Sequence, residues 1–325
     1  MNDQRTAILL ATYNGAAHLD EQLESLACQD HPVIDVYASD DRSSDGTLDI
    51  LRRHADRWRK GRFEIIRREA GNAGSPHTGT SKFSHGLSGS NANFMSLVRN
   101  TQIDAAWYAF CDQDDIWRPS KLSKAIAWLE HQPAAVPAMH CSRTLIIEEG
   151  GKPLRPSLRF ARPPSFQNAI IQNIAAGNTI VMNHAAIEAL RQHTRDGAFV
   201  SHDWWAYQLV TALGGKVHYD ATPLTLYRQH QRNLIGENAS WRARMTRLRM
   251  VMANRFRDWN ETNLRGLSLI RHLMPPENRR VLDDLVALHE AGLLRRPLLL
   301  AQSGIHRQTI LGQVSLFLAA IMDKV

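Results

Sequence analysis

Residues 105–115 read AAWYAFCDQDD, an apolar run that ends in three carboxylates around one amide. A short apolar run of this kind, bounded by a polar cluster, is typical of a buried strand. We therefore predict a strand over residues 105–111 whose carboxyl end delivers Asp112, Asp114 and Asp115 to the surface.

Strand and helix patterns alternate through the whole N-terminal half of the chain. Apolar runs predict the strands, while apolar residues spaced by three and four predict the helices between them. The predicted strands cover residues 7–11, 33–38, 63–66 and 105–111, and the predicted helices begin near Leu19, Gly46 and Asn93. This alternation indicates an α/β fold with a mostly parallel central sheet and helices on both faces.

Polar residues follow three of these strands. They are Thr12-Tyr13-Asn14, Asp40-Asp41 and Asp112-Gln113-Asp114-Asp115. Ligands of α/β sheets bind beyond the carboxyl ends of the strands, so we expect the three clusters to converge on one rim.

The acidic cluster at residues 112–115 is the strongest candidate for a metal site. Carboxylates this close repel one another unless a cation neutralises them. Oxygen ligands suit Mg²⁺ or Mn²⁺, which proteins hold through one or two carboxylates together with substrate phosphates. The alternative is a solvated acidic turn that precedes the next helix.

The second half of the chain offers two further candidates. A strongly amphipathic helix is predicted over residues 202–213, and Asp203 in its first turn could act as a general base toward an acceptor hydroxyl. The alternative is that Asp203 only interacts with the helix dipole. Strands are predicted near residues 216–218 and 224–228. Arg228 and His230 lie at the end of the second strand, where a guanidinium suits a diphosphate, and surface decoration is the alternative.

Composition narrows the class of protein. With 325 residues and 43% hydrophobic side chains, the chain can bury a large core and carry a helical appendage. Three cysteines, an odd number without metal-ligand spacing, indicate a reduced compartment. The chain has no signal-peptide pattern, no run of about 18 apolar residues, and none of the motifs of P-loop kinases, nicotinamide enzymes, serine hydrolases or zinc proteases.

The C-terminal region is basic and reads as helical. Residues 235–325 hold fourteen Lys and Arg against eight Asp and Glu, which accounts for most of the net charge of +7. Its last segment, residues 310–322, is mostly apolar but too short to span a bilayer of about 30 Å. An interfacial anchor, a docking helix for the catalytic domain and a dimer contact all remain open.

In combination and order, the motifs resemble family 2 glycosyltransferases with the GT-A fold. The stretches that carry this resemblance are ATYNG (11–15), DDRSSDGT (40–47) and FCDQDDIW (110–117). Later stretches, GNT (177–179), HDWW (202–205) and YRQH (227–230) with Asn233, are similar to a rhamnosyltransferase-like branch that builds bacterial O-antigen and related surface polysaccharides. The similarity covers about residues 5–235. One departure is Arg42, because the family usually has Gly in this turn.

The resemblance implies a role for each matching residue. The nucleotide would contact Thr12, Tyr13, Asn14, Asp40, Asp41 and Asp112; Mg²⁺ or Mn²⁺ would be held by Asp112, Asp114 and Asp115; Arg228 and His230 would bind the diphosphate; His202, Trp204 and Trp205 would lie on the acceptor side. Asp203 would be the base of an inverting displacement. Residues 1–235 would form the GT-A catalytic domain and residues 236–325 the basic, amphipathic helical region.

The resemblance also implies partners and a location. The donor would be a dTDP- or UDP-linked sugar, with dTDP-rhamnose as the best guess, and the acceptor a lipid-linked glycan. The protein would be cytoplasmic and peripheral on an anionic membrane, with a homodimer through the C-terminal helices possible and no nucleic acid bound. A sugar-nucleotide nucleotidyltransferase and a non-catalytic nucleotide-sugar-binding subunit of a polysaccharide complex are the alternatives.

Overall fold

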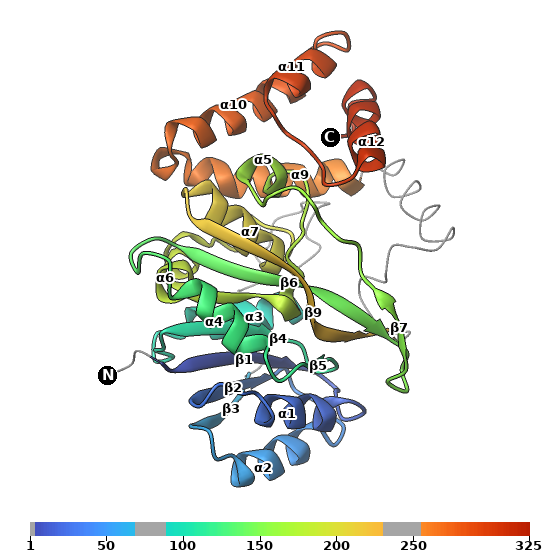
Figure 1. Ribbon diagram of the computed structural model, residues 1–325. Coiled ribbons are helices and arrows are strands. Elements are labelled where there is room, and N and C mark those ends of the chain that lie inside the picture. The colour runs from blue at the N-terminus through green and yellow to red at the C-terminus, as the bar shows by residue number, and fades with distance from the viewer. Residues whose placement is uncertain (1–3, 69–88, 230–254) are drawn as a thin grey trace.

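The computed structural model describes residues 4–68, 89–229 and 255–325 and shows a layered α/β molecule (Figure 1). Its strands are β1 (Thr6–Thr12), β2 (Ile34–Asp40), β3 (Phe63–Arg67), β4 (Trp107–Cys111), β5 (Ile116–Trp117), β6 (Ala138–Ile147), β7 (Pro153–Pro156), β8 (Val181–Asn183) and β9 (Lys216–Arg228). Its helices are α1 (Leu19–Ala27), α2 (Thr47–Arg57), α3 (Gly89–Arg99), α4 (Lys121–Leu129), α5 (Phe166–Ala169), η1 (Gly177–Thr179), α6 (His184–His193), α7 (His202–Ala212), α9 (Arg255–Leu269), η2 (Arg271–Leu273), α10 (Pro276–Glu290), α11 (Arg296–Gln302) and α12 (Ile310–Ile321).

The strands form one sheet in the order β3-β2-β1-β4-β8-β6-β9-β5, with β7 added beside β6. The first four strands are parallel, so their carboxyl ends share an edge, where Thr12 lies beside Asp40 and Asp40 beside Arg67. Next in the sheet, β8 runs antiparallel to both β4 and β6. The predicted α/β class and its central sheet with helices on both faces are confirmed.

Alternation along β1 explains why the sheet is covered on both sides. Ala7, Leu9 and Ala11 pack into one hydrophobic cluster, and Ile8 and Leu10 pack into another. Because successive side chains of a strand point to opposite faces, a strand that is apolar at every position needs a layer of helices on each face.

Helix α7 is not amphipathic, and this prediction was wrong. Every residue of α7 except Asp203 is buried, because the helix lies between the sheet and the C-terminal helices (Figure 1). The strand segments predicted near residues 216–218 and 224–228 are two parts of one long strand, β9, which pairs with β6 across an irregular register.

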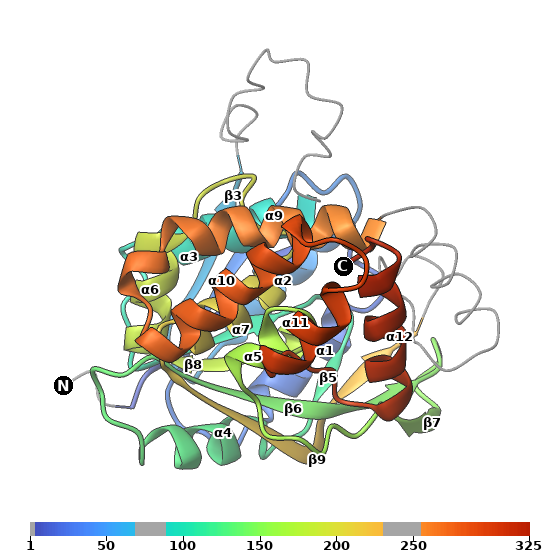
Figure 2. The ribbon, with the colours of Figure 1, turned by 90° about the horizontal axis from the view of Figure 1, so that it is seen from above.

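The C-terminal helices α9 to α12 lie on the same side of the sheet as α7, as the view from above shows (Figure 2). Leu264, Leu282 and Leu316 of these helices belong to the same hydrophobic cluster as Ala7 of β1. No helix among residues 4–68, 89–229 and 255–325 has the length and apolar character needed to cross a membrane.

Several expectations fall on residues that the structure does not describe. These are the predicted domain boundary at residue 235, His230, Asn233, four arginines of the basic C-terminal region (Arg242, Arg244, Arg247 and Arg249), and most of Gly71–Asn91, a stretch rich in Gly, Ser and His that the sequence predicts to be a long loop. The last residues of that loop, from Gly89, are already part of α3.

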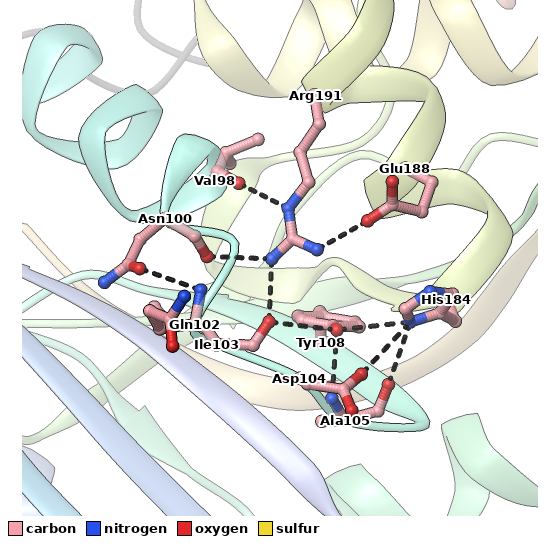
Figure 3. A network of polar contacts seen from close by, with 10 residues as sticks. All are labelled: Val98, Asn100, Gln102, Ile103, Asp104, Ala105, Tyr108, His184, Glu188 and Arg191. Atoms are coloured by element: carbon pink, nitrogen blue, oxygen red, sulfur yellow. Dashed lines mark hydrogen bonds and ion pairs between the residues drawn. The ribbon is translucent and has the colours of Figure 1, made fainter.

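A polar network holds the segment that leads into the amino end of β4 (Figure 3). The Arg191 guanidinium of α6 donates to the carbonyl oxygen of Val98 at 2.8 Å and to those of Asn100 and Ile103 at 3.0 and 2.7 Å. It also pairs with Glu188 at 2.5 Å. One side chain thus satisfies the carbonyl of Val98 in the last turn of α3 and two carbonyls of the loop before β4, at the end of β4 opposite to the acidic cluster.

Replacing Arg191 with alanine is therefore expected to lower the free energy of unfolding by about 3 kcal/mol, since buried carbonyls lose their donor. Urea unfolding of the variant and the wild type measures this. Below the unfolding transition, sugar transfer should stay close to that of the wild type. A large loss of transfer in a variant of unchanged stability would contradict a purely structural role.

Candidate active site

The loops after β1 and β2 are tied together by hydrogen bonds. The Thr12 hydroxyl donates to Asp40 Oδ1 at 3.1 Å, and the Asn14 amide N–H donates to Ser43 Oγ at 2.8 Å. In return, Asn14 Oδ1 accepts from the Ser44 N–H at 2.8 Å. This frame fixes the two loops against each other at the shared carboxyl edge.

Within the frame, the nucleotide-binding candidates differ in accessibility. Thr12 and Asp40 are buried, and Asp40 accepts from the Ser43 backbone N–H at 2.9 Å, so both hold the turn from within. Tyr13 is 59% exposed at the rim. Asp41 is partly exposed and pairs with Arg68 at 3.3 Å. Tyr13 and Asp41 are thus the side chains that this edge presents to a ligand.

Arg42 occupies the turn after β2 with a φ of 63°, in the left-handed region. A side chain with a Cβ is strained there, by about 1–2 kcal/mol, and glycine is not. Its ion pair with Asp41 spans 3.6 Å and the Arg42 side chain is 63% exposed, so the pair offsets little of this strain.

Arg42→Gly is expected to be more stable than Arg42→Ala by about 0.5–1 kcal/mol. Alanine keeps the backbone strain of the folded state. Glycine removes this strain, and part of the gain is offset because glycine raises the conformational entropy of the unfolded chain. Both variants lose the guanidinium, so the comparison isolates the backbone. The midpoints of chemical denaturation measure the difference. An alanine variant as stable as the glycine variant would show that the turn is not strained.

Gln113 connects the acidic cluster to the β1 loop. Its amide oxygen accepts from the Tyr13 N–H at 2.8 Å, and its amide nitrogen donates to the Tyr13 carbonyl at 3.0 Å. A Cβ at Gly15 would stand only 2.2 Å from the Gln113 amide oxygen, so a larger residue there would displace the Gln113 side chain. The backbone of Tyr13 is thereby held next to residues 112–115.

Burial and neighbouring carboxylates raise the pKa values of two members of the acidic cluster. Burial, together with Asp115, Asp114 and Asp203, raises the pKa of Asp112 well above its ordinary value. Burial and Asp114 raise the pKa of Asp115 to about 7. Asp203 adds to this effect, and the ring of its neighbour His202 lies edge-on to Phe110, so the first turn of α7 lies beside the carboxyl end of β4.

Asp115 lies behind the rim. It is 1% exposed, one carboxylate oxygen accepts from the Asn178 amide, and the other accepts from the Arg228 backbone N–H at 3.2 Å. Both oxygens accept from protein donors in this structure, so the role of Asp115 as a metal ligand stays a prediction. Asp112 and Asp114 are the partly exposed carboxylates of the cluster.

Arg228 also differs from the expectation. Its side chain is 2% exposed, and the guanidinium donates to the Asp114 carbonyl at 3.2 Å, to the Glu149 carbonyl and to the Glu21 carboxylate. In this arrangement the guanidinium fixes the backbone of the acidic loop and is not open to a diphosphate. The diphosphate contact of His230 stays a prediction outside the described residues.

Asp203 is oriented by its neighbours. Its Oδ2 accepts from the Asn173 amide at 2.9 Å, and its Oδ1 accepts from the Trp204 N–H at 2.7 Å in the first turn of α7. Asp203 is partly exposed, whereas the ten other residues of α7 are buried.

The three residues expected on the acceptor side, His202, Trp204 and Trp205, all have buried side chains. Trp204 and Trp205 are 5% and 1% exposed and donate to the Ala169 carbonyl and the Thr194 hydroxyl. The His202 ring is buried, stacks on Phe94 and lies edge-on to Phe110.

Asparagine side chains that carry much of the site's order escaped sequence reasoning. Asn91 Oδ1 accepts from the His202 backbone N–H at 3.1 Å and lies 3.0 Å from His202 Nδ1, within hydrogen-bond distance. Asn91 thus holds the start of α7. Asn173 holds Asp203, and Asn93 donates to the ends of β1 and β2. The one sign of them in the sequence is the pair of asparagines in the stretch NANFM at residues 91–95, where the other residues are apolar.

Lys121 is a buried cation beneath the acidic loop. Its ammonium donates to the Asn178 carbonyl at 2.7 Å and lies 2.9 Å from the centre of the Trp117 ring. Burial lowers the pKa of Lys121 well below its ordinary value, although its field still lowers the pKa values of Asp112 and Asp115. The burial of Lys121 could not be predicted from the sequence, because a lysine in the first turn of a helix is usually exposed.

Comparison with known proteins agrees with this geometry. Residues 7–79 match the family described as Glycosyl transferase family 2. The resemblance inferred from the motifs is confirmed. Over 248 residues, the chain is 27% identical to the dTDP-rhamnosyl transferase RfbG of Shigella flexneri, covering 74% of this chain and 78% of that protein.

Solved structures support the fold. The crystal structure of residues 1–349 of S. aureus TarS superposes with a TM-score of 0.53 at 14% identity, covering 93% of this chain and 88% of that chain. The same protein in complex with UDP-GlcNAc gives a TM-score of 0.52 over the same shares. The GT-A fold with added C-terminal helices is thus confirmed, and the family 2 match supports glycosyltransferase activity.

Proposed function

We propose that the protein is an inverting, metal-dependent glycosyltransferase. It transfers rhamnose from dTDP-rhamnose to a hydroxyl of a growing, lipid-linked O-antigen or related surface glycan at the cytoplasmic face of a membrane. The observation that carries this proposal is the packing of the first turn of α7, which bears Asp203, against the carboxyl end of β4, which leads into Asp112. Two opposed elements bring a candidate base and a candidate diphosphate anchor to one space.

The donor side is formed by the ends of β1, β2 and β4. The exposed Tyr13 ring offers a flat apolar surface to a nucleobase, and Asp41 offers an acceptor for a base N–H or a ribose hydroxyl. The frame of hydrogen bonds around Asn14 and Gln113 keeps both side chains in place before the ligand arrives.

The residues present fit a divalent cation of the Mg²⁺ or Mn²⁺ kind. Among the residues that the structure describes, no group of three or more His, Cys, Asp and Glu side chains is arranged to hold a metal. Asp112 and Asp114 are both partly exposed after the carboxyl end of β4, and burial together with three neighbouring carboxylates raises the pKa of Asp112. Asp112 and Asp114 would hold the ion together with the diphosphate of the donor. When bound, the ion would stabilise the charge that develops on the leaving group.

Asp203 supplies the proton acceptor. Oriented by Asn173, its carboxylate would take the proton of the acceptor hydroxyl while that oxygen attacks the anomeric carbon from the face opposite to the diphosphate. The diphosphate departs as the new bond forms. One base and one displacement invert the anomeric configuration.

The donor and acceptor are inferred from similarity. RfbG is named as a dTDP-rhamnosyl transferase, which favours dTDP-rhamnose, whereas TarS was crystallised with UDP and UDP-GlcNAc, which keeps UDP-linked sugars open. A nucleotidyltransferase would need a Gly-rich basic loop after the first strand, and ATYNG at residues 11–15 has none. A non-catalytic subunit would have no need of an oriented carboxylate at Asp203.

A thermal-shift panel of dTDP, UDP and GDP with and without Mn²⁺ tests the proposal. A ligand at about 100 times its dissociation constant should raise the unfolding midpoint by about 5 °C, with one nucleotide preferred and with Mn²⁺ required. No shift with any nucleotide would contradict the donor site.

The metal effect should depend on pH in a defined direction. Without metal, the raised pKa of Asp112 and the pKa of Asp115 near 7 mean that the fold binds protons more tightly than the unfolded chain does. Stability from these groups is therefore lost as the pH rises from about 4 through 7. Mn²⁺ should restore it, so its thermal shift should be larger at pH 8 than at pH 6 and absent in Asp114→Asn. A larger shift at pH 6 would be contrary to this account.

A further inference from the structure

One face of α12 is apolar and exposed. Ile310, Val314 and Leu318 recur every four residues and are 87%, 51% and 55% exposed, and Leu311 beside them is 68% exposed. The sequence has no charged residue from 308 to 322. An exposed apolar face of this size marks an interaction site in a folded protein.

The other side of α12 is already used for packing. Leu316, Ala319 and Ala320 are buried and join the hydrophobic core cluster. The helix is therefore docked to the protein through one face, as one of the three sequence-based readings expected. The exposed face is a second apolar surface that this packing leaves uncovered.

A basic strip runs from the acidic loop to α12. We define the strip as residues 152–162, KPLRPSLRFAR, which hold four cations and no acidic residue. The four cations, Lys152, Arg155, Arg159 and Arg162, are all exposed. Between them Leu154 and Leu158 are 48% and 49% exposed. The strip thus alternates cations with exposed apolar side chains.

The strip and α12 form one continuous surface. At one end the Arg162 N–H donates to Gln308 Oε1 at 3.0 Å, and Arg162 lines an open hollow of about 450 Å³ with Ile310, Val314 and Leu318 of α12. At the other end, the strip follows the turn whose Glu149 carbonyl accepts from Arg228. Figures 1 and 2 both place β7 and α12 at the same end of the molecule.

We propose that α12 and the basic strip together form the surface through which this protein lies on an anionic lipid bilayer. Apolar side chains of an interfacial helix enter the boundary of the acyl chains while neighbouring cations meet the anionic headgroups. The proposed function explains why membrane binding would be useful to this protein, and the inference rests on it in that respect only. It would place Arg228 and the acidic loop close to lipid, where a lipid-linked acceptor is presented.

Charge decides between a bilayer and a second copy of the chain. In a two-fold contact centred on the strip, its cations would face the same cations of the partner, which is unfavourable. An anionic bilayer complements these cations and the apolar face at the same time. The bilayer is therefore the occupant that both halves of the surface fit.

Vesicle flotation with the full-length protein tests the proposal. Vesicles of phosphatidylcholine alone are compared with vesicles that contain about 30% phosphatidylglycerol, at low and at high salt. We expect the wild type to float with the anionic vesicles at low salt and to bind at least about tenfold less to the neutral ones. High salt should weaken binding because it screens the cations.

Two variants separate the halves of the surface. Leu311→Gln with Leu318→Gln should lower vesicle binding about tenfold or more, and Arg159→Gln with Arg162→Gln should lower it and remove its salt dependence. Matched controls are Leu269→Gln, exposed by 57% at the far end of α9, and Arg52→Gln with Arg57→Gln on α2. Both controls should bind like the wild type.

Three outcomes would overturn the proposal. The wild type could fail to float, or the surface variants could float like the wild type. Alternatively, size-exclusion chromatography with light scattering could show a dimer that only the α12 variant dissociates, which would assign the face to a second copy. Thermal unfolding is measured for each variant. If the wild type does not bind vesicles and the α12 variant is much less stable than the wild type, the apolar face of α12 would have a role in folding and not in membrane binding. Binding of nucleoside diphosphates is scored separately, so failure of the donor site is distinguishable from failure of this surface.

Discussion

Asp203→Asn is expected to lower the turnover number about a hundredfold or more, while the affinity for the nucleoside diphosphate stays close to that of the wild type. Asparagine keeps the shape of the side chain and can keep one of the two hydrogen bonds that Asp203 accepts, but it cannot accept the proton. The carboxylate is already held by Asn173, so the backbone of α7 should not move. Steady-state transfer kinetics and nucleotide titration measure the two quantities.

The matched control for this variant is Asp49→Asn. Asp49 also lies in the first turn of a helix, α2, and its side chain is 79% exposed far from the acidic loop. Both variants lose a favourable interaction with a helix dipole, and only Asp203→Asn loses a base. Equal turnover in the two variants would assign Asp203 to helix stability, and a loss of nucleotide affinity in Asp203→Asn would move it to the donor side.

Asp114→Asn is expected to reduce metal-dependent transfer about a thousandfold or more, since the ion contributes several kcal/mol to stabilising the leaving group. The fold should survive, because Asp114 lies on the loop after β4 and Arg228 holds its backbone carbonyl, which the substitution keeps. Transfer is measured against Mn²⁺ concentration, together with the midpoint of thermal unfolding.

Asp104→Asn provides the comparison at the opposite end of the same strand. Asp104 precedes the amino end of β4 and is 62% exposed. This variant should retain both transfer and its dependence on Mn²⁺. Near wild-type transfer by Asp114→Asn, with metal still required, would exclude Asp114 as a ligand.

The fold could be predicted from the sequence to the extent that local patterns determine it. Apolar runs such as residues 7–11 and 105–111 gave the parallel strands and their common edge, because a strand buried on both faces is apolar at every position. The merger of two short runs into β9 and the burial of α7 could not be predicted in this way. Both depend on how the C-terminal helices cover the sheet, which is a tertiary property.

The sequence predicted where most candidate residues of the site lie, but it did not predict which of them face the rim. The strand ends that lead into Tyr13, Asp41 and Asp112 share one edge, as the sequence predicted. Burial then separates residues that face the rim from residues that support it, and a single sequence does not report burial at a loop. Arg228 and Asp115 therefore proved to support the acidic loop from behind.

The most direct test of the central claim is a transfer assay with the purified protein, Mn²⁺, labelled dTDP-rhamnose and a lipid-linked glycan acceptor. Nucleoside diphosphate release and sugar incorporation are measured together for the wild type, Asp114→Asn and Asp203→Asn. We predict equal amounts of released diphosphate and incorporated sugar for the wild type, and almost none for either variant. Equal incorporation by all three proteins, or pyrophosphate release from a nucleoside triphosphate and a sugar phosphate in place of sugar transfer, would contradict the assignment.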